Sequence, residues 1–105
     1  MPICAVDVET TGASENDRVW EIGAVRYDHT GREASYFQGM IDPGIPISEE
    51  IQKLCNVTQE EVTVNGRPAA EVLRQFALFS DGAVLVAYNA PFDVRFLEME
   101  RHRLG

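Results

Sequence analysis

Long hydrophobic runs, basic residues and cysteine are all scarce in this chain of 105 residues. The longest apolar run, residues 83–88, is far too short to span a bilayer, and the chain starts without the basic segment typical of a signal peptide. The two cysteines, Cys4 and Cys55, lack metal-ligand spacing and are typical of free core thiols in a reducing compartment. We therefore expect a cytoplasmic protein with no membrane partner.

Positive charge is outweighed by negative charge, with 9 basic against 17 acidic residues and a formal net charge of −8. This balance argues against unaided binding of a polyanion through a broad basic face. An enzyme that holds phosphate through bound divalent cations and grips only a strand end needs no such face. The charge therefore disfavours a sequence-reading DNA-binding protein more strongly than an end-trimming nuclease.

The hydrophobic pattern of the first half predicts three strands, at residues 3–6, 19–27 and 32–41. The second and third are separated by a turn at residues 28–31 and should form an antiparallel hairpin. The length and a hydrophobic content of 45% are those of one folded domain.

The second half predicts helices around one further strand. Ser48 is expected to cap a short helix, Thr58 and Glu61 have the spacing of a capping box, and Pro68 is suited to the first turn of a third helix. The apolar residues 83–88 are typical of a strand buried on both faces of a parallel sheet, and a last helix is expected over residues 92–104, with Phe92, Phe96 and Met99 on its inner stripe. This order of elements predicts an α/β fold with a mixed sheet flanked by helices.

Two carboxylates, Asp7 and Glu9, stand where the first strand meets a loop. Side chains two apart in a strand point to the same face, roughly 6 to 7 Å apart. Asp93 lies in the first turn of the last helix, just past the fourth strand, and would join them if strands one and four are neighbours. Neighbouring carboxylates repel, whereas Mg²⁺ or Mn²⁺ favours their charged forms. The sequence thus predicts a metal site of Asp7, Glu9 and Asp93.

The chain resembles the DEDD-type 3′–5′ exonucleases of the ribonuclease H-like fold, a family that includes the proofreading epsilon subunit of bacterial DNA polymerase III. Residues 7–12 (Asp-Val-Glu-Thr-Thr-Gly) match the first family motif, and residues 89–97 (Asn-Ala-Pro-Phe-Asp-Val-Arg-Phe-Leu) match the second. The resemblance implies that Asp7, Glu9 and Asp93 are catalytic and bind two ions, Mg²⁺ or Mn²⁺. It also implies four substrate-binding residues, which are Thr10, Thr11, Asn89 and Phe92.

Several of these residues also suit plainer roles. Asn89 and Pro91 are typical of a turn that starts a helix, Phe92 equally suits the core, and Thr10 could satisfy backbone groups of its loop. Both histidines, His29 and His102, are expected to be solvated and uninvolved. An Asp-x-Glu pair by itself is common on solvated surfaces, so the metal assignment depends on the second motif.

The activity implied by the resemblance is two-metal-ion hydrolysis of terminal phosphodiester bonds in single-stranded DNA, or RNA, at a 3′ end, with a DNA polymerase subunit as a partner. The family's third motif, a histidine or tyrosine followed by an aspartate, has no counterpart, because His102 lies in the same helix as Asp93. We therefore expect residues 1–105 to be the N-terminal part of a single exonuclease domain that lacks its last strand and helix. Two alternatives remain open: a catalytically incomplete fragment that binds metal or nucleotide, and a half-domain completed by a second chain, or by self-association, at the uncovered edge of residues 83–88.

Overall fold

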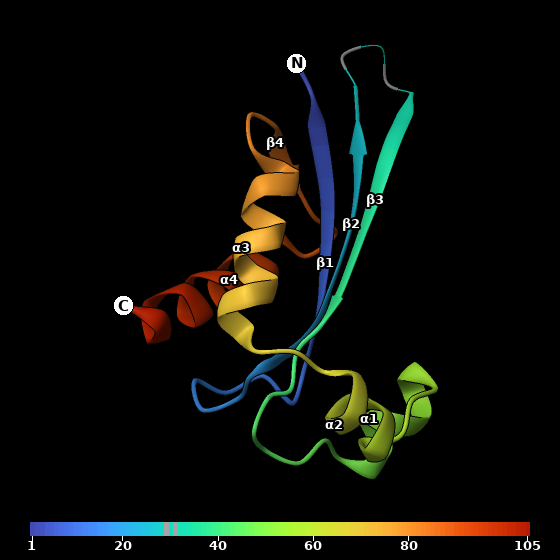
Figure 1. Ribbon diagram of the computed structural model, residues 1–105, viewed down its shortest axis with the longest axis vertical. Coiled ribbons are helices and arrows are strands. Elements are labelled where there is room, and N and C mark those ends of the chain that lie inside the picture. Colours follow the sequence, from blue (N-terminus) through green and yellow to red (C-terminus); the bar gives the residue numbers. More distant parts are fainter. Residues whose placement is uncertain (29, 31) are drawn as a thin grey trace.

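The computed structural model describes residues 1–28, 30 and 32–105, so the predicted turn at 28–31 and His29 fall partly or wholly outside the described residues. The elements follow one another as β1 (Ile3–Thr10), β2 (Val19–Tyr27), β3 (Glu33–Met40), α1 (Glu49–Cys55), α2 (Gln59–Asn65), α3 (Ala69–Ser80), β4 (Val84–Val86) and α4 (Ala90–Leu104) (Figure 1). Every strand and helix expected from the sequence is present.

The sheet is mixed, with the strand order β3-β2-β1-β4. β2 pairs antiparallel with both β1 and β3, which confirms the hairpin, whereas β4 runs parallel to β1. The parallel ladder is short and joins Ile3 to Val84 and Ala5 to Val86. Strands one and four are therefore neighbours, and the expectation of a mixed α/β sheet is confirmed.

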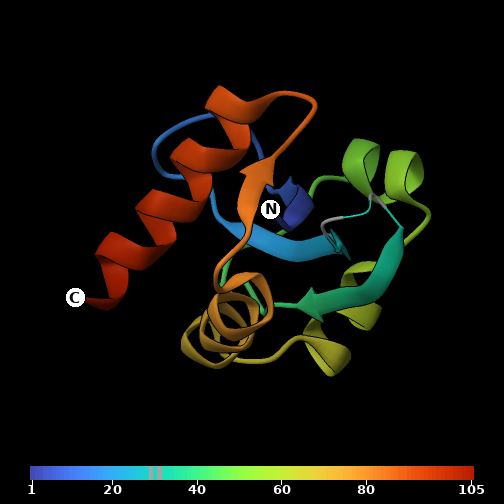
Figure 2. The same cartoon turned by 90° about the horizontal axis from the view of Figure 1, so that it is seen from above.

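One face of the sheet is covered by α3 and α4. Alternate residues of β1 and β2, such as Val6 and Ile22, turn to this face and are buried with Val72 and Phe76 of α3 and Phe96 of α4. The two helices lie on the same side of the sheet when it is viewed from above (Figure 2). The opposite face carries Asp7 and Glu9.

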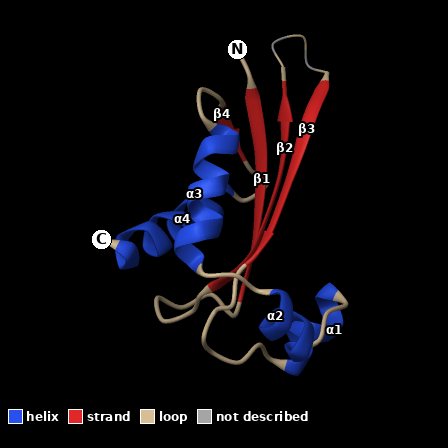
Figure 3. Ribbon diagram, viewed as in Figure 1, coloured by secondary structure: helices blue, strands red, loops and turns tan. Residues whose placement is uncertain are grey.

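α1 and α2 lie at the end of the sheet where β1 finishes (Figure 3). The hydroxyl groups of Ser48 and Thr58 accept hydrogen bonds from the third residue beyond them and cap the two helices, as their spacing predicts. Trp20 of β2 is buried against Ile47 and Val62, and this contact attaches the helix pair to the sheet.

The expected burial of residues 83–88 is wrong. The strand has three residues, and the side chains of Val84, Leu85 and Val86 are 41–45% exposed. The physical reason is that β4 lies at the edge of the sheet. Within the described chain it pairs with one strand, β1, so its apolar side chains are covered less than those of a central strand. The uncovered edge of β4 agrees with the sequence-based expectation.

None of the described helices is long and apolar enough to cross a membrane.

Candidate active site

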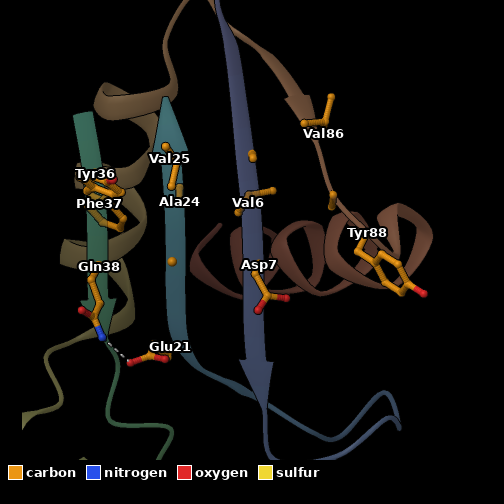
Figure 4. A pocket seen from close by; sticks show the side chains of 13 residues that line it. Val6, Asp7, Glu21, Ala24, Val25, Tyr36, Phe37, Gln38, Val86 and Tyr88 are labelled. Carbon is orange, nitrogen blue, oxygen red and sulfur yellow. Dashed lines mark hydrogen bonds between the residues drawn. The ribbon is translucent and has the colours of Figure 1, made fainter. Parts of the chain in front are cut away.

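β1 carries Asp7 and Glu9 on its open face, as their spacing predicts. Asp7 lies opposite Gly23 of β2, and Glu9 lies opposite Glu21, whose carboxylate accepts a 2.9 Å hydrogen bond from Gln38. Figure 4 shows Asp7, Glu21 and Gln38 along an open groove of about 1100 Å³, which Val86 and Tyr88 also line. The groove lies along the uncovered sheet face, and the carboxylates that line it are those of Asp7 and Glu21.

Asp93 reaches the same strand from α4. Its side chain is 3% exposed, and Oδ1 accepts a 3.0 Å hydrogen bond from the backbone N–H of Val8, the residue between Asp7 and Glu9. The ladder between β1 and β4 ends at Ala5, so no strand partner is paired with Val8 on that side. The carboxylate of Asp93 therefore takes the place of a strand carbonyl at this amide.

Burial, followed by neighbouring negative charge, raises the pKa of both carboxylates of β1. Desolvation, and then the charge of Asp93, raise the pKa of Asp7 above its usual value. Desolvation is also the main cause that raises the pKa of Glu9, with additional repulsion from Asp7, Glu21 and Asp93. A divalent cation between these groups would favour their charged forms, and their oxygen donors suit Mg²⁺ or Mn²⁺.

The described residues nevertheless include no group of three histidine, cysteine or acidic side chains that converges on one point. Asp93 points Oδ1 at the Val8 amide, and Oε2 of Glu9 accepts a 3.4 Å hydrogen bond from the Sγ–H of Cys55. The chain thus brings Asp7, Glu9 and Asp93 to one end of β1 without directing all three at a common centre, and the metal assignment stays a prediction.

Comparison with known proteins identifies the family. Residues 4–105 match the RNase T family, whose description is exonuclease. The chain belongs to this exonuclease family. The chain is 44% identical over 101 residues to a PolC-type DNA polymerase III of Caldanaerobacter subterraneus subsp. tengcongensis, and 42% identical over 101 residues to that of Lactococcus lactis. The matches cover 94% of this chain but only 7% and 6% of those relatives.

Solved structures of exonuclease I share the fold. A product-bound structure superposes with a TM-score of 0.85 at 19% identity, covering 97% of this chain and 25% of that one. A complex of the Escherichia coli enzyme with a dT13 oligonucleotide gives a TM-score of 0.83, again at 19% identity, covering 97% of this chain and 24% of that one. The expected resemblance to DEDD-type exonucleases and the ribonuclease H-like fold class are therefore confirmed.

In this exonuclease chain the threonines of the first motif are bonded within their own loop. Thr10 Oγ1 donates to the carbonyl oxygen of Gly12 at 2.6 Å, and Thr11 Oγ1 donates to Asp17 at 2.8 Å. A Cβ atom at Gly12 would lie 2.5 Å from Oδ2 of Asp17, so a side chain here would displace the carboxylate that Thr11 contacts. The plainer structural role of Thr10 is thus present, and its contact with nucleotide stays a prediction.

The residues of the second motif lie at the start of α4. Asn89 is exposed and makes no side-chain capping bond, while its carbonyl oxygen accepts from the N–H groups of Phe92 and Asp93. The ring of Phe92 is partly buried, 4.7 Å from that of Phe96. Both readings of Phe92, core and pocket wall, therefore remain consistent with its position, and His102 is exposed as expected.

Two residues of the exonuclease chain that contact the site or its helix were not predicted from the sequence, namely Glu100 and Cys55. Glu100 is fully buried, where the expected inner stripe held only apolar residues, and Cys55 contacts Glu9. Desolvation, followed by the bond to Glu9, raises the pKa of Cys55 to about 11. Glu100 lies seven residues after Asp93 on one helix, and this spacing was the available signal that Glu100 faces the sheet as well. No local signal relates Cys55 to Glu9.

Proposed function

We propose that this chain supplies the substrate-cleaving end of a 3′–5′ exonuclease domain that removes nucleotides from single-stranded DNA, with RNA as the alternative substrate. One observation carries the proposal: Asp93 is bonded to the amide of the residue that separates Asp7 from Glu9. This contact holds the acidic residues of both exonuclease motifs at the same end of β1.

Asp7, Glu9 and Asp93 are the residues proposed to hold two divalent cations, Mg²⁺ or Mn²⁺. Two such ions, when bound, would supply an activated water and would neutralise charge on the attacking and leaving oxygens. The three carboxylates position the scissile phosphate against the end of β1. Rotation of Glu9 away from Cys55 and of Asp93 about its bond to Val8 would turn both carboxylates toward Asp7.

Four residues around the carboxylates are proposed to bind the terminal nucleotide. Thr10 and Thr11 follow Glu9 directly, and Asn89 and Phe92 begin the helix that carries Asp93. Support for a single-stranded DNA substrate comes from exonuclease I, which was solved with dT13 and dA16 oligonucleotides. Support for a polymerase partner comes from the PolC-type relatives, and a cytoplasmic location remains part of the proposal.

We further propose that residues 1–105 are the N-terminal part of the domain and that another polypeptide segment covers the open sheet face. The exposed β4 edge and the groove beside Asp7 and Tyr88 support this. A segment bringing a histidine or tyrosine and a further aspartate would supply the base and the remaining ligand. The second candidate, a half-domain completed by another chain, is favoured by the same exposed edge.

The test is shortening of a 5′-labelled single-stranded oligonucleotide with Mn²⁺. We expect a ladder of products that EDTA and Asp7→Ala abolish, while Glu60→Ala, which removes an exposed carboxylate on α2, leaves it unchanged. Folded protein that binds Mn²⁺ but yields no ladder would favour the incomplete fragment. Absence of Mn²⁺ binding in the wild type would contradict the metal site itself.

A further inference from the structure

The inner face of α4 carries two buried carboxylates rather than one. Asp93 and Glu100 are seven residues apart, so they lie two turns apart on the same side of the helix, with the buried Phe96 between them. Each accepts a hydrogen bond from a strand N–H: Asp93 from Val8 at 3.0 Å and Glu100 from Val19 at 2.9 Å. α4 is thus attached to the sheet by a carboxylate at each of two positions.

Glu100 is also the centre of a charged network. Arg18 donates from Nε to Oε2 at 3.0 Å and from Nη2 to Oε1 at 2.9 Å, and Arg103 donates from Nη1 to Oε2 at 3.1 Å. The other side of Arg103 holds the loop between β1 and β2, because its Nη2 donates to the carbonyl oxygens of Glu15 and Asp17 at 2.7 and 3.2 Å. This loop begins with Thr11 of the first motif, directly after Thr10 at the end of β1.

A network of this kind is a poor means of adding stability, because apolar residues of similar volume often stabilise a core equally well. The specific effect of the network is to restrict the position of α4 relative to the sheet. Glu100 accepts short bonds from donors outside α4, the N–H of Val19 and two N–H groups of Arg18, and these admit far fewer helix positions than an apolar contact would. The position of α4 along β1 decides where Asp93 stands relative to Asp7 and Glu9.

We propose that Glu100 is a positioning residue of the active site, which fixes α4 and the first-motif loop so that Asp93 meets β1 between Asp7 and Glu9. The role in metal binding rests on the proposed function, whereas the mechanical link from Glu100 to the Asp93–Val8 bond does not. Glu100 need not touch substrate or metal to act in this way.

The first test is amide hydrogen exchange, measured by NMR, in Glu100→Gln. We expect exchange at the Val8 amide to accelerate about tenfold or more, while the Ala24 amide in the middle of β2 changes little, since local opening differs from global unfolding. Glu98→Gln is the matched control, because it removes a carboxylate of the same helix from an exposed ion pair with Arg101. Equal acceleration of both amides, or an unchanged Val8 amide in folded protein, would overturn the proposal.

The second readout is Mn²⁺ affinity, followed by electron paramagnetic resonance. We expect Glu100→Gln to weaken Mn²⁺ binding about tenfold, as residues that orient metal ligands typically do, and Glu98→Gln to leave it unchanged. If wild type does not bind Mn²⁺, the proposed function fails and the exchange experiment alone decides the link. Should Glu100→Gln not fold, the double variant Arg18→Gln/Glu100→Gln removes both charges, and the same outcomes support or overturn the proposal.

Discussion

The Asp7 carboxylate lies where desolvation and the charge of Asp93 both disfavour its ionised form. Its pKa in the folded protein is above the ordinary value of 3.8, so the unfolded chain releases this proton first as the pH rises. Stability contributed by the protonated group is therefore present below pH 3.8 and is lost as the pH rises through the folded-state pKa. At neutral pH the ionised group works against the fold until a cation binds.

Asp7→Asn is expected to raise the midpoint of thermal unfolding in EDTA at pH 7 by about 2 °C, a small effect because the side chain is exposed to solvent screening. Near pH 3 the difference should disappear, since Asp7 is then protonated in both states. Added Mn²⁺ should stabilise the wild type and leave the variant unchanged. Circular dichroism measures these midpoints, and a lower midpoint for Asp7→Asn at pH 7 in EDTA would contradict the electrostatic account.

Residues whose partners are close in sequence, or whose motif is specific, could be predicted. Asp7, Glu9 and Asp93 were expected together on this ground, and the structure brings them to one end of β1, while their role as metal ligands stays a prediction. Glu100 and Cys55 were missed, because Glu100 is paired with Arg18, 82 residues away, and Cys55 with Glu9, 46 residues away. The spacing from Asp93 on the same helix was a local signal for Glu100, and Cys55 had none. A charged residue on a helix is expected at the surface until a distant arginine is known to meet it.

Among the elements, the short helices were predictable from their caps and β4 was predictable only in part. Ser48 and Thr58 act through the backbone three residues ahead, so their effect is local. The apolar run at 83–88 locates a strand correctly, but burial depends on which elements lie beside it, and that information is not local. Leu54 of α1 shows the same limit, since it is apolar but faces solvent.

Thr58→Ala is expected to lower the free energy of unfolding by about 1 kcal/mol, because the N–H of Glu61 loses its capping acceptor. Thr63→Ala, in the interior of the same helix, should change it by less than about 0.5 kcal/mol. Urea unfolding followed by tryptophan fluorescence suits the comparison, since Trp20 packs in the same cluster as Val62 of α2. Equal effects of the two variants would show that the cap contributes nothing specific.

On the scale of the whole molecule, the two faces of the sheet differ sharply. α3 and α4 cover one face, whereas the other carries the groove and the side chains of Asp7 and Glu9, and the β4 edge lies beside β1. An exposed strand edge with apolar side chains is a template for pairing with another strand. The expected self-association through this edge therefore stays open to a direct test.

We expect the molar mass of the wild type, measured by sedimentation equilibrium, to increase with protein concentration. Val86→Lys should restore a monomer mass at every concentration, because a charged side chain blocks pairing at the edge. Val64→Lys, at an exposed position on α2, should leave the association unchanged. A wild-type mass that is monomeric throughout, or association that survives Val86→Lys, would contradict self-association through the β4 edge.

The parallel pairing of β1 with β4 has a consequence for the time at which the site forms. The β2–β3 hairpin closes over a connection of residues 28–32, whereas the bond between Val8 and Asp93 joins residues 85 positions apart. Closing the longer loop costs about 2.5 kcal/mol more in chain entropy. During synthesis, Asp7 and Glu9 leave the ribosome well before α4, so the three candidate carboxylates come together only after nearly every other contact among the residues between them has had the opportunity to form.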